Sequence, residues 1–201
     1  APVCNIALTI TGANPSCSNG NNGSITLTVN GAAGPLTFDW NVNSLDGIQN
    51  PAGLQAGPYS VVVTDAVGCQ ATASVTLGNP PALTLACAQL SPVTTVGGSN
   101  GAASVQIGGG TPGYTLTWSG PDSGSQNQAA AGTATIGNLR AGAYSLTVTD
   151  ANGCEQTCSF SIQAPVCNIA LTITGANPFC NNGNNGSITL GQARITGDSI
   201  R

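Results

Sequence analysis

Internal repetition narrows the range of folds that this sequence can adopt. The segment VCNIALTITGANPSCSNGNNGSITL (3–27) recurs as VCNIALTITGANPFCNNGNNGSITL (166–190), and only two positions differ. Within that long period, GLQAGPYSVVVTDAVGC (53–69) matches NLRAGAYSLTVTDANGC (138–154). Repetition on this scale is typical of a row of similar units, and it indicates a longer parent array. We expect a first unit at 1–80, a second unit at 81–164, the start of a third unit at 165–190, and a non-repeat tail at 191–201.

Alternation of apolar and polar residues predicts β-strands in every unit. In GSITLTVN (23–30) the apolar side chains fall on every second residue, and PYSVVVTD (58–65) and AYSLTVTD (143–150) show the same pattern. A period of two residues is that of a half-buried strand, and clusters of Gly, Asn and Pro separate the runs. Six or seven short strands in about 80 residues indicate an immunoglobulin-like β-sandwich. The predicted fold class is therefore all-β, with tandem immunoglobulin-like sandwiches braced by disulfides.

Four aromatic residues support this fold class. Trp40 and Trp118 fall on the third predicted strand of their units, where such sandwiches bury a tryptophan. Tyr59 and Tyr144 follow LQAG and LRAG corners, as in a tyrosine corner whose hydroxyl bonds back to the backbone. We assign all four to the core on grounds of alternation; the alternative is a surface on which sugars stack.

Composition narrows the possible functions. The chain has no His, no Met and no Lys, and its three basic residues are Arg140, Arg194 and Arg201. His is the commonest general base and metal ligand, and Lys is needed for Schiff-base chemistry. A net charge of -4 argues against nucleic acid as a partner, and no apolar run is long enough for membrane insertion. We expect a protein that is not an enzyme and binds no cofactor.

The eight cysteines are interpreted as structural disulfides, which places the protein outside the cytosol. When the first two units are aligned, Thr9 and Ala73 of the first unit stand at the positions of Cys87 and Cys158. The second unit therefore has both of these cysteines, and the first unit has neither. Three bonds are predicted within the chain: Cys17–Cys69, Cys87–Cys158, and Cys154–Cys167 as a staple between units. Two cysteines are expected to have no partner in this chain: Cys4, which would bond to a preceding unit, and Cys180, which would pair within a completed third unit.

Three stretches together resemble the SprB-type repeat of very large surface proteins of Bacteroidota, including gliding-motility adhesins. They are GGTPGYTLTWSG (109–120), NLRAGAYSLTVTDANGC (138–154) and NPSCSNGNNGSITLTV (14–29). Unit one departs from the pattern, with AAGPLTFDW (32–40) in place of the GGTP stretch, and unit two lacks the early Cys. The resemblance implies an exported, cell-surface protein that acts as an adhesive stalk or filament, and it transfers no catalytic residue.

Few residues are candidates for other chemistry. Asp65 and Asp150 lie in TDxxG turns and are calcium candidates, but calcium prefers six to eight oxygen ligands and the acidic residues are scattered, so an ordinary Asp turn is the favoured interpretation. Ser199 lies in DSI, which resembles the short O-glycosylation motif of Bacteroidota.

The sequence predicts a structural and adhesive segment of an extracellular bacterial surface protein, acting through many weak contacts along a stiff rod. Its expected partners are neighbouring repeats, other copies of the chain, and a surface polysaccharide or substratum. One alternative is a filament subunit that polymerises by β-strand donation through its C-terminal tail. Another is a carbohydrate-binding or accessory module of a secreted enzyme, which an exposed aromatic strip would favour.

Overall fold

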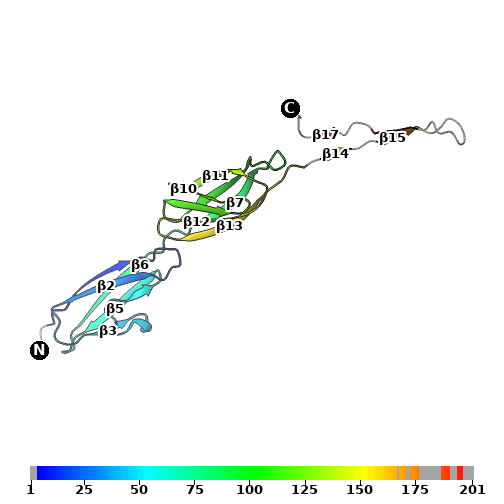
Figure 1. Cartoon of the computed structure of the whole chain (residues 1–201). Coiled ribbons are helices and arrows are strands. Elements are labelled where there is room, and N and C mark those ends of the chain that lie inside the picture. The colour runs from blue at the N-terminus through cyan, green and yellow to red at the C-terminus, as the bar shows by residue number, and fades with distance from the viewer. Residues whose placement is uncertain (1–3, 167, 171–172, 177–186, 191–193, 197–201) are drawn as a thin grey trace.

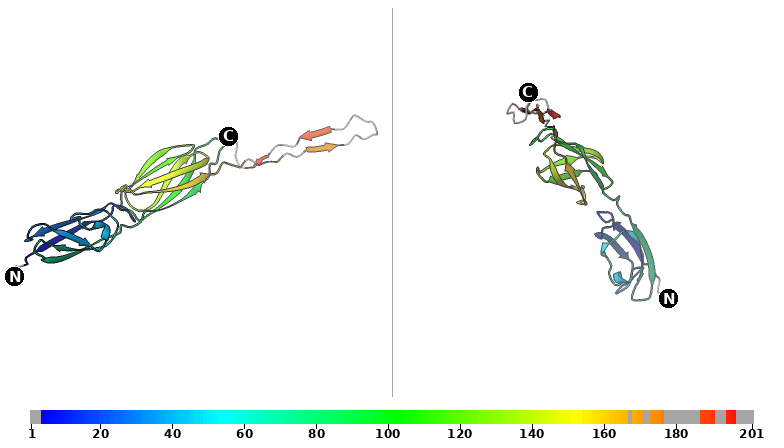
Figure 2. Two further views of the ribbon diagram at one scale, coloured as in Figure 1. Left: turned by 90° about the horizontal axis from the view of Figure 1, so that it is seen from below. Right: turned by 90° about the vertical axis from the view of Figure 1, so that its right-hand side faces the viewer.

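The computed structural model describes residues 4–166, 168–170, 173–176, 187–190 and 194–196. Two β-sandwiches follow one another along the chain, and paired strands continue beyond the second one (Figures 1 and 2). The first sandwich consists of β1 (Ala7–Ala13), β2 (Gly23–Asn30), β3 (Thr37–Trp40), the 3-10 helix η1 (Asn43–Leu45), β4 (Ala52–Leu54), β5 (Gly57–Thr64) and β6 (Gln70–Leu77). The second consists of β7 (Thr84–Ser91), β8 (Gly101–Gly108), β9 (Tyr114–Ser119), β10 (Gly124–Gln128), β11 (Gly132–Leu139), β12 (Gly142–Thr149) and β13 (Glu155–Ile162). None of the described segments is a helix that could cross a membrane.

The first sandwich packs two antiparallel three-stranded sheets, in the orders β1-β2-β4 and β3-β5-β6. The period-two pattern of the sequence decides which side chains point inward. On β2, Ile25 and Leu27 are each 1% exposed, and on β5 the side chains of Val61 and Val63 are buried in the same cluster. The strands therefore form where the alternation predicts, because one face of each is buried against the other sheet.

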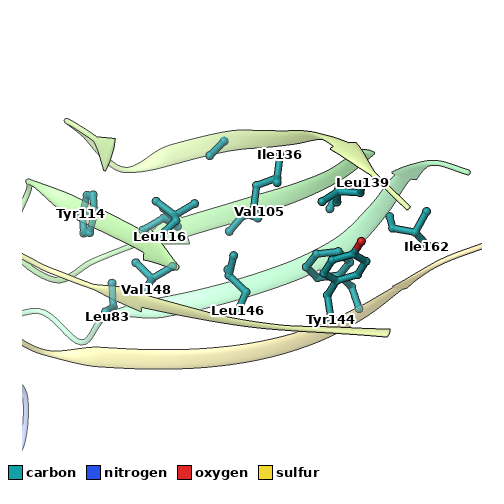
Figure 3. Packing of buried hydrophobic residues seen from close by; sticks show 14 of the residues in the cluster. Leu83, Val105, Tyr114, Leu116, Ile136, Leu139, Tyr144, Leu146, Val148 and Ile162 are labelled. Atoms are coloured by element: carbon teal, nitrogen blue, oxygen red, sulfur yellow. The ribbon is translucent and has the colours of Figure 1, made fainter. Parts of the chain in front are cut away.

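The second sandwich packs a sheet of order β11-β8-β7 against a sheet of order β10-β9-β12-β13. Its core lies between β8, β9 and β12, where Val105, Leu116, Leu146 and Val148 are fully buried (Figure 3). Both bodies are thus all-β sandwiches with immunoglobulin-like pairing, and they carry disulfides. The predicted fold class is confirmed.

The aromatic side chains whose burial the structure describes are buried or half-buried in the two sandwiches. Trp40 is 2% exposed and donates from Nε1 to the Ile48 carbonyl at 2.8 Å, whereas Trp118 is only half-buried at the edge of its core. The hydroxyl of Tyr59 donates to the Gln55 carbonyl at 3.0 Å. No aromatic side chain is exposed among the residues whose burial the structure describes, so a sugar-stacking strip finds no support there.

The two tyrosines occupy the same corner of their sandwiches. Like Tyr59, Tyr144 bonds to the carbonyl four residues earlier, that of Arg140, at 3.0 Å. Its hydroxyl also lies 2.8 Å from Asp122 Oδ2, and the same carboxylate pairs with the Arg140 guanidinium at 2.8 Å. Burial and the hydrogen bond to Asp122 together raise the pKa of Tyr144 to about 12. The Tyr144 hydroxyl therefore keeps its proton across the physiological pH range, and the hydrogen bonds that it makes at this corner of the sandwich are kept as well.

Beyond the second sandwich, β14 (Asn168–Ala170) pairs with β17 (Arg194–Thr196), and β15 (Ile173–Ala176) pairs with β16 (Ser187–Leu190). The one described strand of the predicted non-repeat tail, β17, thus lies beside β14 of the predicted third unit (Figure 1). Ser199 lies outside the described residues.

Candidate functional site: the covalent junction between the sandwiches

Three disulfides join the described cysteines, and they correct two of the three predicted pairs. The bonds are Cys4–Cys69, Cys17–Cys154 and Cys87–Cys158, with Cα–Cα distances of 5.4, 5.6 and 6.0 Å. Cys87–Cys158 is the pair that the column comparison indicated. The predicted pairs Cys17–Cys69 and Cys154–Cys167 are wrong, and Cys4 bonds inside its own sandwich rather than to a preceding unit. Cys167 and Cys180 lie outside the described residues.

Strand direction explains why Cys17 does not reach Cys69. The starts of β1 and β6 are tied by Cys4–Cys69, and Gly12 near the end of β1 lies against Leu77 at the end of β6, so the two strands run the same way. Cys17 follows β1, whereas Cys69 precedes β6, which has eight residues. Eight residues span about 26 Å in a strand, far beyond the roughly 7 Å that a disulfide tolerates between Cα atoms.

The same argument applies to Cys154. This cysteine directly precedes the eight-residue strand β13, at the end of the second sandwich that meets the first. Cys167 comes after that strand in the sequence. Cys154 is bonded instead to Cys17, in the β1–β2 loop of the first sandwich. A staple between units therefore exists, but it lies at the entry to the second sandwich and not at its exit.

Hydrogen bonds hold the residues around the staple. Asn152 donates from Nδ2 to the Ser16 carbonyl at 3.1 Å across the junction, and to Thr111 Oγ1 at 2.9 Å within its own sandwich. Ser16 is fixed in turn by Asn22, whose Oδ1 accepts from the Ser16 N–H at 2.9 Å. Both residues of this contact, Asn152 and Ser16, are thus held by further hydrogen bonds within their own sandwiches.

The connecting segment from Gly78 to Leu83 forms a second link between the sandwiches. It contains Pro80 and Pro81, which restrict the backbone to extended conformations. Its start is tied to the first sandwich, because the Gly78 N–H donates to Asn14 Oδ1 at 2.7 Å and the Asn19 N–H donates to Asn79 Oδ1 at 2.9 Å. The junction is therefore crossed once by a disulfide and once by a restrained backbone.

The three disulfides and the backbone together close one covalent ring around the junction. One side of the ring contains β1 and the start of β13, joined by the Cys17–Cys154 bond. The other side contains β6, the connecting segment and the start of β7. In order, the ring passes through Cys4, Cys17, Cys154, Cys158, Cys87 and Cys69, and it returns to Cys4. Both sandwiches are thereby joined by two covalent tracks rather than one.

The two calcium candidates hold turns at corresponding places. Asp65 accepts from the N–H groups of Val67 and Cys69 through Oδ1, at 3.0 and 2.9 Å, and from Ala33 through Oδ2 at 3.1 Å. Its side chain belongs to a residue only 8% exposed. Burial raises the pKa of Asp65, but the backbone hydrogen bonds outweigh it and hold that pKa below its usual value.

Asp150 is held in the same way beside the staple. Oδ1 accepts from the N–H groups of Asn152 and Cys154, both at 2.9 Å, and Oδ2 accepts from Thr111 at 2.8 Å. Burial raises the pKa of Asp150, and the three N–H groups outweigh it and hold the pKa below its usual value. Because both of its oxygens already accept N–H groups, the Asp150 carboxylate positions the turn that carries Cys154. Within the described part of the chain, no three His, Cys, Asp or Glu side chains gather as a metal site would require.

These lowered pKa values predict loss of stability in acid. A carboxyl whose pKa is lowered by folding contributes stability that is fully present above its unfolded pKa of about 4 and is lost as the pH falls through its folded pKa. We expect Asp150→Asn to destabilise the second sandwich by about 1–3 kcal/mol at pH 7, because an amide Nδ2 then faces an N–H donor. Thermal unfolding from pH 7 down to pH 2 measures both effects. Asp39→Asn, at an exposed position on β3, is the matched control, and an equal effect there would contradict the assignment.

The chain is similar to several known proteins over parts of its length. The family model of the SprB repeat matches residues 6–45, which lie in the first sandwich. Among curated proteins, no match is found. Among solved structures, the chain is similar to the eight N-terminal immunoglobulin domains of Down syndrome cell adhesion molecule, with 15% identity over 80% of this chain and 25% of that chain and a TM-score of 0.38. It is also similar to murine CEACAM1b, with 17% identity over 79% of this chain and 100% of that chain and a TM-score of 0.29.

A third similar structure is latent PorU from Porphyromonas gingivalis, with 10% identity over 79% of this chain and 20% of that chain and a TM-score of 0.28. The SprB match suggests a segment of a surface adhesin, and three disulfides are consistent with a location outside the cytoplasm. Residues 6–45 therefore carry a SprB repeat, the family that the sequence motifs indicate.

Proposed function

We propose that this chain is a spacer segment of a large extracellular bacterial surface protein, where it acts as a stalk and as a multivalent adhesin in gliding or surface attachment. The observation that carries the proposal is the Cys17–Cys154 disulfide between the two sandwiches. A bond at this position adds little to the core of either sandwich, since its two sulfurs lie in loops at the junction. It limits how far the neighbours can bend or separate, which is what a stalk under tension requires.

The covalent ring strengthens this argument. Tension applied between Cys4 and Cys158 is carried by two tracks in parallel, so the strands between Cys17 and Cys69, and between Cys87 and Cys154, lie outside the shortest covalent path. Most of the core strands, including β2, β5, β8 and β12, are therefore not extended when the ends are pulled. A protein whose task is binding alone has no need of such an arrangement.

The chemistry of the surface supports weak, repeated contacts rather than one specific pocket. Only 5% of the residues are charged, and no Lys or His is available. Ser and Thr are the commonest residues on the outward strand faces, and they can form hydrogen bonds with a polysaccharide or a hydrated substratum. Individually weak contacts become strong when many copies act together, because each further contact forms at a high effective concentration.

Two measurements test the proposal. Immunogold labelling of intact cells should mark thin surface filaments, and beads that carry many copies of the chain should attach to polysaccharide-coated glass, whereas beads with a few copies should detach under flow. Bovine albumin beads of equal density are the control. Labelling that requires permeabilised cells, or attachment that does not depend on copy number, would contradict the proposal.

Strand donation is a second candidate, and one observation favours it. The strands β14–β17 form only two-stranded ladders within the described residues, so each ladder has edges that another strand could join. Removal of residues 168–201 should then abolish association between chains, and unchanged association would exclude this candidate. No exposed aromatic side chain supports a carbohydrate-binding module in the described part of the chain whose burial is known.

A further inference from the structure

The two sandwiches have corresponding loops at their far ends, the ends toward the C-terminus. In the first, Asn22 accepts from the Ser16 N–H at 2.9 Å; in the second, Asn100 accepts from the Thr94 N–H at 3.1 Å. Both loops also contain a residue with a left-handed backbone, Asn19 with φ 57° and Gly97 with φ 73°. The correspondence places Val96 where the first sandwich has Ser18, and Thr95 where it has Cys17.

The far ends nevertheless differ in character. That of the first sandwich is polar, with a hollow lined by Asn19, Gln55, Ala56 and Asn79. The matching hollow of the second sandwich is lined by two glycines, by Arg140, and by the apolar residues Val93, Val96, Ala141, Ala164 and Pro165. Val96 and the nearby Val166 are each 78% exposed. This second end has no cysteine in the loop with which to form a staple.

The near ends, toward the N-terminus, differ in the opposite way: that of the second sandwich is polar, and that of the first is apolar. The second sandwich presents Asn152 and Thr111, and Asn152 bonds to the polar far end of the first. At the corresponding positions the first sandwich presents Val67, which is 53% exposed, and Ala33, which is exposed. Its Cys69, in the place of Cys154, is already bonded to Cys4.

From this pattern we infer that the apolar far end of the second sandwich is a docking surface for the near end of a first-type sandwich, with Val96 against Val67. In solution the occupant is a second copy of this chain. A far end and a near end already meet once in this chain, where a polar contact and a disulfide join the first sandwich to the second. At the proposed contact between the second sandwich and a first-type sandwich, there is no disulfide, and the facing residues are apolar instead of polar.

The sequence indicates that such a meeting occurs along the chain. Residues 166–190 repeat 3–27 almost without change, so sequence of the first type directly follows the second sandwich. Stapled and unstapled junctions would then alternate, and the unstapled ones would be held by apolar contact. This inference deepens the proposed spacer function and rests on it, because it needs sandwiches arranged in series.

Methyl NMR on the full chain over a concentration series tests the inference. We expect the methyl signals of Val96 and Val67 to shift with rising concentration, whereas those of Ile48, a 45% exposed residue in the β3–β4 connection, should not. Val96→Asn should stop the shift at Val67, and Val67→Asn should stop the shift at Val96, with association weakened by about tenfold or more. Ile48→Asn is the matched control and should leave both shifts in place.

Each other result overturns the inference. Signals that stay fixed up to the solubility limit exclude end-to-end docking, and shifts at Val67 that persist in Val96→Asn exclude this pairing. Association that survives both valine variants but disappears when residues 168–201 are removed assigns it to strand donation instead. None of these results decides the spacer function, which is tested separately by labelling intact cells and by bead attachment.

Discussion

Stretched between its two ends, the oxidised chain should stop about 490 Å short of the length that the fully reduced chain reaches. The Cys17–Cys154 bond joins residues 137 apart in sequence, and each extended residue contributes roughly 3.6 Å. While the ring is closed, tension can extend only the residues before Cys4, the residues after Cys158, and one of the two tracks between these cysteines. Single-molecule force spectroscopy with and without reductant measures this difference directly.

A variant without the staple provides the discriminating control. In Cys17→Ser/Cys154→Ser, tension passes through the second track, from Cys4 to Cys69, along the backbone to Cys87, and across to Cys158. The two tracks contain almost the same number of residues, so the final length should hardly change. Replacement of all six ring cysteines by serine should give the full length without reductant. If the staple-free variant already reaches that length, the ring does not exist.

Removal of the Cys87–Cys158 disulfide should destabilise the second sandwich by about 4 kcal/mol and leave the first unchanged. The two cysteines are 71 residues apart, and the chain-entropy model gives a loss of this size when such a loop is opened in the unfolded state. The bond lies between β7 and β13, which belong to opposite sheets, so it braces the second core across its two layers.

Hydrogen exchange locates this effect. In Cys87→Ala/Cys158→Ala, the slowest amides of β8 and β12 should exchange up to about 1,000-fold faster, whereas those of β2 and β5 should keep their rates. Cys4→Ala/Cys69→Ala is the matched variant and should give the reverse pattern. Equal acceleration in both sandwiches would mean that they unfold as one cooperative unit.

The fold could be predicted from the sequence because it depends on local patterns that each unit repeats. Alternation along 23–30 and 143–150 determines which face of β2 and β12 is buried, and the LxAGxY corners place Tyr59 and Tyr144. Cys87–Cys158 could be paired because both cysteines are absent from the first unit, and the strands that carry them face one another across the sandwich.

The other disulfides could not be found by comparing columns. Cys69 and Cys154 follow the same TDxxG turn in their units, and Cys154 is left without a partner in its own unit because Thr95 stands where the first unit has Cys17. In the structure they have different partners, since Cys69 bonds within its sandwich and Cys154 bonds to the neighbour. Strand direction was the signal that could have excluded the wrong pairs. Cys17 lies at the opposite end of β6 from Cys69, and in the sequence Cys154 precedes β13 whereas Cys167 follows it.

The covalent ring also determines what a protease could do to this segment. A single cut in a peptide bond anywhere between Cys4 and Cys158 opens at most one of the two tracks, and the other still connects the ends. Cuts in the long loops of either sandwich open neither. Two separate cleavages are therefore needed before the segment is severed.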